Sequence, residues 1–130
     1  MSDLMTVNIP IADPGGDDKQ LFIFRAPESY GGCRLVQAEA VNKAATSGGT
    51  TFTYCLHKYS NAGTPAVNGT VTDVLGGTTA YWADGVPKEF TIDEDYSFLD
   101  AGEWLVLDYQ EIATGSPTLS NVNLVFEMGK

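Results

Sequence analysis

Side chains that carry out chemistry are scarce in this sequence. Its 130 residues include one histidine, His57, and two unclustered cysteines, Cys33 and Cys55. No glycine-rich phosphate-binding loop precedes a helix, because the sequence has almost no helical periodicity. We therefore expect no enzymatic activity and no cofactor or resident metal, and a protein that binds, caps or coats.

His57 and Cys55 form the one pair that has the residue types of a base and a nucleophile. They are two residues apart on one predicted strand, so their side chains share a face of it. The sequence around them supplies no third group to orient the histidine, as nucleophilic catalysis requires. We expect His57 to be a solvent-facing or interface residue.

Basic residues are also few. The chain has 7 Lys and Arg against 17 Asp and Glu, a formal net charge of −10. Nucleic acids are therefore not expected partners, since phosphate binding needs clustered basic side chains. There is no signal peptide pattern and no apolar run of about 20 residues, so we expect synthesis in the cytosol and no membrane insertion. Free thiols are then expected, with a Cys33–Cys55 disulfide as the alternative.

What the sequence does contain is alternation of apolar and polar residues, interrupted at short intervals by Gly, Pro, Asn and Asp. This pattern predicts an all-β, single-domain antiparallel β-sandwich, jelly-roll-like, with about eight strands. We expect an N-terminal strand or arm with a flexible loop over residues 1–18 and the sandwich over residues 19–130. The middle of the chain, residues 67–85, gives the weakest pattern.

The core is predicted from residues that share the same alternating phase. On residues 34–41, Val36 is expected on one face with Ala38 and Ala40. The predicted core consists of Phe22, Phe24, Phe52, Tyr54, Leu56, Leu105, Leu107, Val122, Leu124 and Phe126.

Two apolar segments are candidates for an interface. Met5, Val7, Ile9 and Ile11 form an apolar face, and Pro10 places their strand at a sheet edge because proline lacks a backbone N–H. This segment is expected either to anchor the protein to a partner or to be an ordinary first strand of its own sheet.

The second candidate is the aromatic pair Tyr81 and Trp82, in the weakly patterned middle of the chain. Exposed aromatic side chains there would anchor a protein interface or stack on a sugar ring. The alternative is that the pair closes one end of the domain's own core.

Two acidic segments have the residue types of calcium ligands. They are Asp13 with Asp17 and Asp18, and the run Asp93–Asp95. Neither has the spacing of an EF-hand loop. We expect both to be solvated turns.

The order of motifs along the chain resembles one family. The motifs are FIFRAP (22–27), the Ala-rich strand 36–41, FTYCL (52–56), AGEWLVL (101–107) and VNLVF (122–126). In this order they resemble the small β-sandwich structural proteins of tailed bacteriophages, especially capsid decoration (cement) proteins.

The resemblance implies a jelly-roll-like module, often a homotrimer, on the outer surface of the virion. There it would bind and stabilise the major capsid protein shell at quasi-threefold positions. The family has no catalytic residues to carry over. A carbohydrate-binding β-sandwich module and a phage tail or neck component are the alternatives.

Overall fold

The computed structural model describes residues 3–12, 19–28, 31–43, 52–60, 67–76, 85–111 and 119–129. Tyr81, Trp82 and the acidic residues of the loop 13–18 lie outside these residues. The described residues contain ten strands and no α-helix, so no helix among them could span a bilayer. The strands are β1 (Leu4–Ala12), β2 (Lys19–Arg25), β3 (Cys33–Lys43), β4 (Phe52–Tyr59), β5 (Val67–Thr70), β6 (Leu75–Gly76), β7 (Lys88–Glu89), β8 (Phe98–Leu99), β9 (Trp104–Glu111) and β10 (Leu119–Met128).

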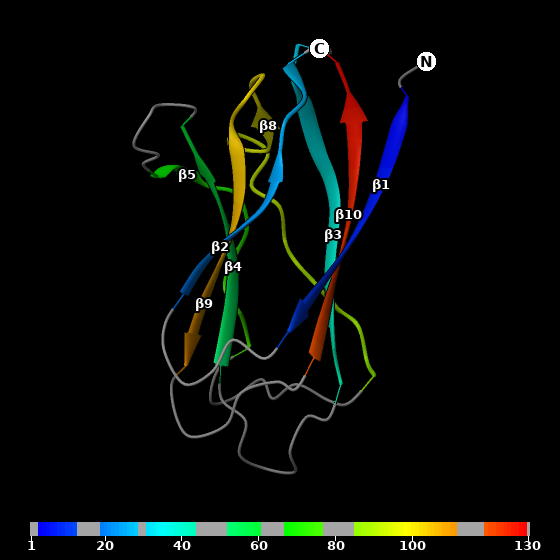
Figure 1. Cartoon of the computed structure of the whole chain (residues 1–130), viewed down its shortest axis with the longest axis vertical. Helices are drawn as coiled ribbons and strands as arrows, with labels where there is room; N and C mark the ends of the chain where they lie inside the picture. The colour runs from blue at the N-terminus through cyan, green and yellow to red at the C-terminus, as the bar shows by residue number, and fades with distance from the viewer. Residues whose placement is uncertain are drawn as a thin grey trace.

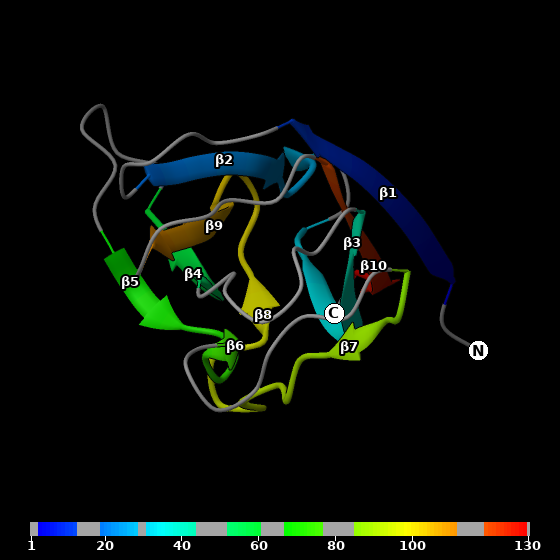
Figure 2. The ribbon, with the colours of Figure 1, turned by 90° about the horizontal axis from the view of Figure 1, so that it is seen from below.

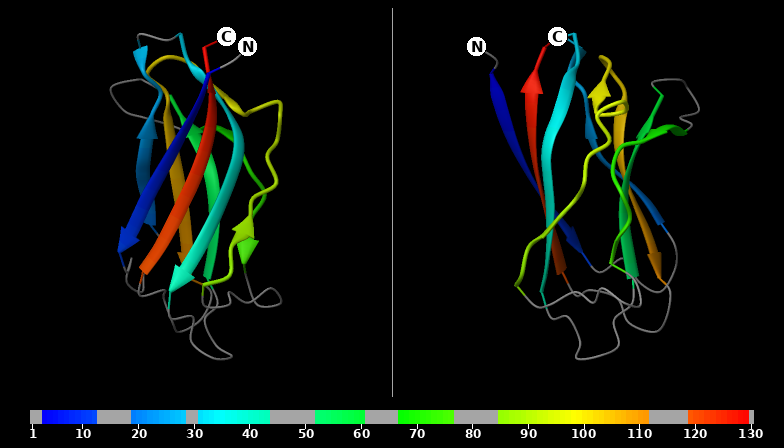
Figure 3. Two further views of the ribbon diagram at one scale, coloured as in Figure 1. Left: turned by 90° about the vertical axis from the view of Figure 1, so that its right-hand side faces the viewer. Right: turned by 180° about the vertical axis from the view of Figure 1, so that it is seen from behind.

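The strands form two antiparallel sheets that pack face to face (Figure 1). Sheet A has the order β1-β10-β3-β7, with β8 also on β3, and sheet B has the order β2-β9-β4-β5, with β6 also on β4. From β1 to β4 the chain changes sheet at each step, and β10 returns beside β1 (Figure 3). This is the topology of a jelly roll, so the predicted fold class is confirmed.

The structure has ten strands where about eight were predicted, because two of the expected strands are each divided into two short ones. Both β5 and β6 pair with β4, and both β7 and β8 pair with β3. Each pair of short strands therefore occupies one strand position of an eight-stranded jelly roll. Pro87 precedes β7, and between residues 86 and 92 the strand pairing is limited to Lys88–Glu89 and an isolated bridge at Ile92.

The core lies between the sheets, and most of the predicted core residues are in it. Phe52, Tyr54, Leu56, Leu105, Leu107, Val122, Leu124 and Phe126 are fully buried. Phe24 stacks on Phe126 with ring centroids 4.3 Å apart. A buried hydrogen-bond chain also joins the sheets, because the Tyr54 hydroxyl lies 2.7 Å from Ser120 Oγ, which donates to Asn42.

Two predictions of side-chain direction are wrong, and a bulge explains each. Phe22 is 45% exposed, because the β2–β9 register shifts between Phe22 and Phe24 and turns Phe22 outward. Val36 is 42% exposed, because the β3–β10 register shifts at Val36: Gln37 pairs with Val125, and Leu35 pairs with Phe126. One extra residue in a strand reverses the alternation that follows it.

β1 is an edge strand of the domain's own sheet A. It pairs with β10 in unbroken register from Leu4 to Ala12, and Pro10 lies in it as predicted for an edge. Ile11 is buried, and Met5, Val7 and Ile9 pack against the core. β1 and β2 border one another on the same side of the sandwich, as the view along its long axis shows (Figure 2).

Candidate functional site

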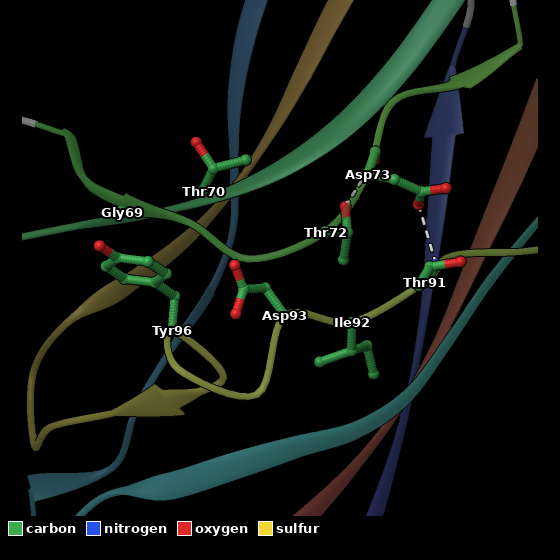
Figure 4. A pocket seen from close by; sticks show the side chains of 8 residues that line it. All are labelled: Gly69, Thr70, Thr72, Asp73, Thr91, Ile92, Asp93 and Tyr96. Atoms are coloured by element: carbon green, nitrogen blue, oxygen red, sulfur yellow. Dashed lines mark hydrogen bonds between the residues drawn. The ribbon is translucent and has the colours of Figure 1, made fainter.

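A cleft lies where the edges of the two sheets meet, and both polar and apolar side chains line it. It has a volume of about 530 Å³ and lies between the segment that follows β5 and the segment that precedes β8 (Figure 4). Its lining residues are Gly69, Thr70, Thr72, Asp73, Thr91, Ile92, Asp93 and Tyr96. This volume lies within the range of small-molecule sites.

Backbone hydrogen bonds hold the two walls of the cleft together. Asp73 N–H donates to Thr91 O at 3.0 Å, and Asp93 N–H donates to Val71 O at 2.8 Å. Between them, Thr72 forms an isolated antiparallel bridge with Ile92. The walls are therefore connected along their length and hold their side chains at fixed positions.

The two carboxylates of the cleft are oriented by backbone N–H groups. Asp73 Oδ1 accepts from Thr91 N at 2.8 Å, and Asp93 Oδ1 accepts from Asp95 N at 3.0 Å. The run Asp93–Asp95 belongs to a turn, as predicted. Within the part of the chain that the structure describes, no group of three or more His, Cys, Asp or Glu side chains could hold a metal ion.

Tyr96 forms one end of the cleft. Its ring packs so closely on Gly69 that a Cβ atom there would lie 2.5 Å from Tyr96 Cδ1. Gly69 also has a φ of 153°, which side-chain-bearing residues rarely adopt. Lys58 Nζ lies 6.0 Å from the ring centroid, yet Tyr96 remains 44% exposed. The absence of a side chain at Gly69 therefore lets the Tyr96 ring pack against the backbone, while much of the ring remains exposed to solvent.

A second candidate region lies on the outer face of sheet B. Phe22 packs edge-on against Tyr59 and Trp104, with ring centroids 5.3 and 5.4 Å away. Arg25 lies 5.8 Å from the Trp104 ring centroid. We call these four side chains the aromatic face. The sequence reasoning missed it because it placed Phe22 in the core.

His57 and Cys55 also lie on the outer side of sheet B, but their surroundings do not activate a thiol. His57 Nε2 is 3.7 Å from Asp108 Oδ2, so the structure does supply a carboxylate beside the histidine. Cys55 is buried, however, and its Sγ donates to Thr72 O at 3.5 Å. Burial raises the pKa of the Cys55 thiol, a hydrogen bond with Thr72 lowers it in part, and the charges of Asp108 and Asp73 raise it again, so the pKa lies above its ordinary value.

Cys33 is a buried core residue of sheet A. Both cysteines are free, as predicted, and no disulfide joins them. Burial raises the pKa of the Cys33 thiol to about 11, so the reactive thiolate is scarce at neutral pH.

The predicted interface residues of the N-terminal segment lie on the core side of β1. Met5, Val7 and Ile9 are half-buried against the core, and Ile11 is 7% exposed. Their apolar atoms are therefore largely used by the domain itself. What β1 presents to a neighbour is its free backbone edge and Leu4, which is 66% exposed.

No protein-family model matches this chain, and comparison with curated proteins finds no match.

Proposed function

We propose that this chain is a non-enzymatic structural protein of a virion, a decoration protein that binds the outer surface of the major capsid shell and stabilises it. The jelly roll supports this by analogy, since viral capsid and lectin domains use it. The order of sequence motifs, which resembles that of phage decoration proteins, supports it further.

The aromatic face carries the proposal, since the outer sides of both sheets are otherwise polar: on sheet B, Asp108 accepts from Gln20 at 3.0 Å and from Gln110 at 3.2 Å. Sheet A presents a polar row, in which Asn8 donates to Asn123 and Asn123 donates to Glu39 at 3.0 Å. Sheet B presents the aromatic face, which has the Trp, Tyr, Phe and Arg side chains that dominate binding energy at protein interfaces. We infer that sheet B contacts the shell and sheet A faces solvent.

The chemistry around Cys55 supports a non-enzymatic role. A catalytic cysteine needs a lowered pKa and access to substrate. Cys55 has a raised pKa and is 5% exposed, and its hydrogen bond goes to a backbone carbonyl. The His57–Asp108 pair is then a polar contact within the outer side of sheet B.

A homotrimer on the shell is part of the proposal. Three copies on one threefold position would multiply a weak single contact through their effective concentration. The exposed edge of β1 is available for a contact between copies, since it pairs only with β10 among the described strands.

The experiment is co-sedimentation with expanded capsids of the virus that encodes this chain. The variant Phe22→Ala/Arg25→Ala alters the aromatic face, and Val36→Ala is the control, because Val36 is similarly exposed but lies on sheet A. We expect the native chain and Val36→Ala to pellet with capsids. The double variant should bind at least about tenfold more weakly at an unchanged oligomeric state.

Two results would count against the proposal. One is a native chain that stays in the supernatant at every capsid concentration or sediments with isolated tails instead. The other is a double variant that retains full binding, which would remove the aromatic face from the contact. Melting curves of each variant establish that a loss of binding is not a loss of folding.

A further inference from the structure

We propose that the cleft between Tyr96 and Asp73 binds a neutral saccharide, with its carboxylates and threonine hydroxyls on the sugar hydroxyls and the Tyr96 ring on a sugar face. This proposal is independent of the capsid role, because the cleft lies at the sheet edge and shares no residue with the aromatic face.

Asp73 and Asp93 are oriented to accept hydrogen bonds from the hydroxyl groups of a sugar. Asp73 Oδ1 accepts a hydrogen bond from a backbone N–H at 2.8 Å, and Asp93 Oδ1 accepts one at 3.0 Å. The second oxygen of each has no hydrogen-bond partner within the described residues. Each Asp is therefore oriented in advance and still has an acceptor for a ligand hydroxyl, and hydrogen bonds to a charged group are the strong ones.

Threonine residues line the cleft together with these acceptors, and the Thr70 hydroxyl also lies 3.4 Å from His57 Nδ1. Thr70 and Thr91 are exposed in the cleft, and a threonine hydroxyl both donates and accepts, as a sugar hydroxyl does. The carboxylate of Asp93 points toward the side of the cleft where Thr70 and Tyr96 lie (Figure 4). In the same view the Asp73 carboxylate extends toward the opposite end of the cleft, above Thr91, so the two acceptors lie at different ends of the site.

The Tyr96 ring supplies the apolar part of the site. A pyranose has one face of C–H groups, and an aromatic ring packs well on such a surface. The ring of Tyr96 is seated on Gly69 and remains 44% exposed. Ile92 adds a second apolar group to the lining. The cleft therefore combines an aromatic platform with fixed acceptors, as saccharide recognition requires.

Charge selects neutral sugars over acidic ones. The chain carries a formal net charge of −10, and the exposed residues Glu94 and Asp95 adjoin Asp93. An anionic sugar would be repelled by this field. Calcium fits less well than a sugar, because it takes six to eight oxygen ligands and no group of three or more His, Cys, Asp or Glu side chains among the described residues could hold a metal ion.

The experiment is a glycan array of neutral and acidic oligosaccharides, followed by saturation-transfer NMR with the strongest neutral ligand. Asp73→Asn/Asp93→Asn keeps the Oδ1 acceptors for the backbone N–H groups but removes both charges. Asp95→Asn is the matched control, since it removes a neighbouring charge outside the lining. We expect about tenfold or greater weakening in the double variant and in Tyr96→Ala, and a change below about twofold in the control.

The proposal is overturned if no neutral saccharide on the array binds at millimolar concentration. It is equally overturned if a bound sugar keeps its affinity in both cleft variants, or if acidic sugars bind better than neutral ones. If the double Asn variant fails to fold, Tyr96→Ala tests the proposal instead, because Tyr96 is 44% exposed and lies outside the core.

Discussion

Replacing Leu107 with alanine tests the packing of the sandwich at its centre. Leu107 lies in the middle of β9 and is fully buried, with Leu21 opposite it on β2 and Leu56 opposite it on β4. The substitution removes three carbon atoms from a site enclosed by both neighbouring strands and by sheet A.

The cost follows from that environment. Three buried carbons represent roughly 2.4 kcal/mol of transfer free energy at about 0.8 kcal/mol each. The cavity left behind adds to this, so the free energy of unfolding should fall by about 3–4 kcal/mol. For a domain of this size that loss lowers the melting temperature by roughly 10–15 °C.

Urea denaturation followed by far-ultraviolet circular dichroism measures the loss. Leu119→Ala is the matched control, because Leu119 is also a strand leucine but is 43% exposed, and it should lose less than about 1 kcal/mol. A loss below about 0.5 kcal/mol for Leu107→Ala would mean that Leu107 faces solvent and that the assigned core is wrong.

Two further predictions concern β1 and Cys33. Deleting residues 1–12 should lower the melting temperature by at least roughly 10 °C, because β1 pairs along its whole length and buries Ile11; an unchanged melting temperature would instead favour an anchoring arm. The thiol pKa of Cys33 rises from 9.0 to about 11 on folding, so its contribution to stability is complete below pH 9 and is lost as the pH rises toward 11. The urea midpoint of the native chain should therefore fall between pH 9 and 11, and that of Cys33→Ala should fall less; equal pH profiles would contradict this.

Much of the fold was predictable because alternation persists along the long strands. Phe52, Tyr54 and Leu56 on β4 and Leu105 and Leu107 on β9 keep one phase, and all five are buried as predicted. Side chains of successive residues in a strand point to opposite faces, so a strand with one buried face has apolar residues at every second position.

The bulges that turn Phe22 and Val36 outward were not predictable from that period. The β2–β9 register shifts between Phe22 and Phe24, and the β3–β10 register shifts beside Val36. A bulge depends on pairing with a strand distant in sequence, and apolar residues on both sides of it give no local sign of the change. The aromatic face was missed for this reason.

The cleft was not predictable either, because its walls are joined by long-range contacts. Thr72 bridges Ile92 across the edges of the two sheets, and Asp73 binds Thr91 through its side chain. The sequence places Asp73 in a weak strand and Asp93 in an acidic turn, with nothing to connect them. The seating of Tyr96 on Gly69 is likewise visible only in three dimensions.

The most direct test of the capsid role is a cryo-electron microscopy map of expanded capsids saturated with this chain. The account predicts added density on the outer surface at threefold positions, in three copies, with the aromatic face of sheet B toward the shell and sheet A toward solvent. Capsids without added density, or density in which sheet A contacts the shell, would contradict it.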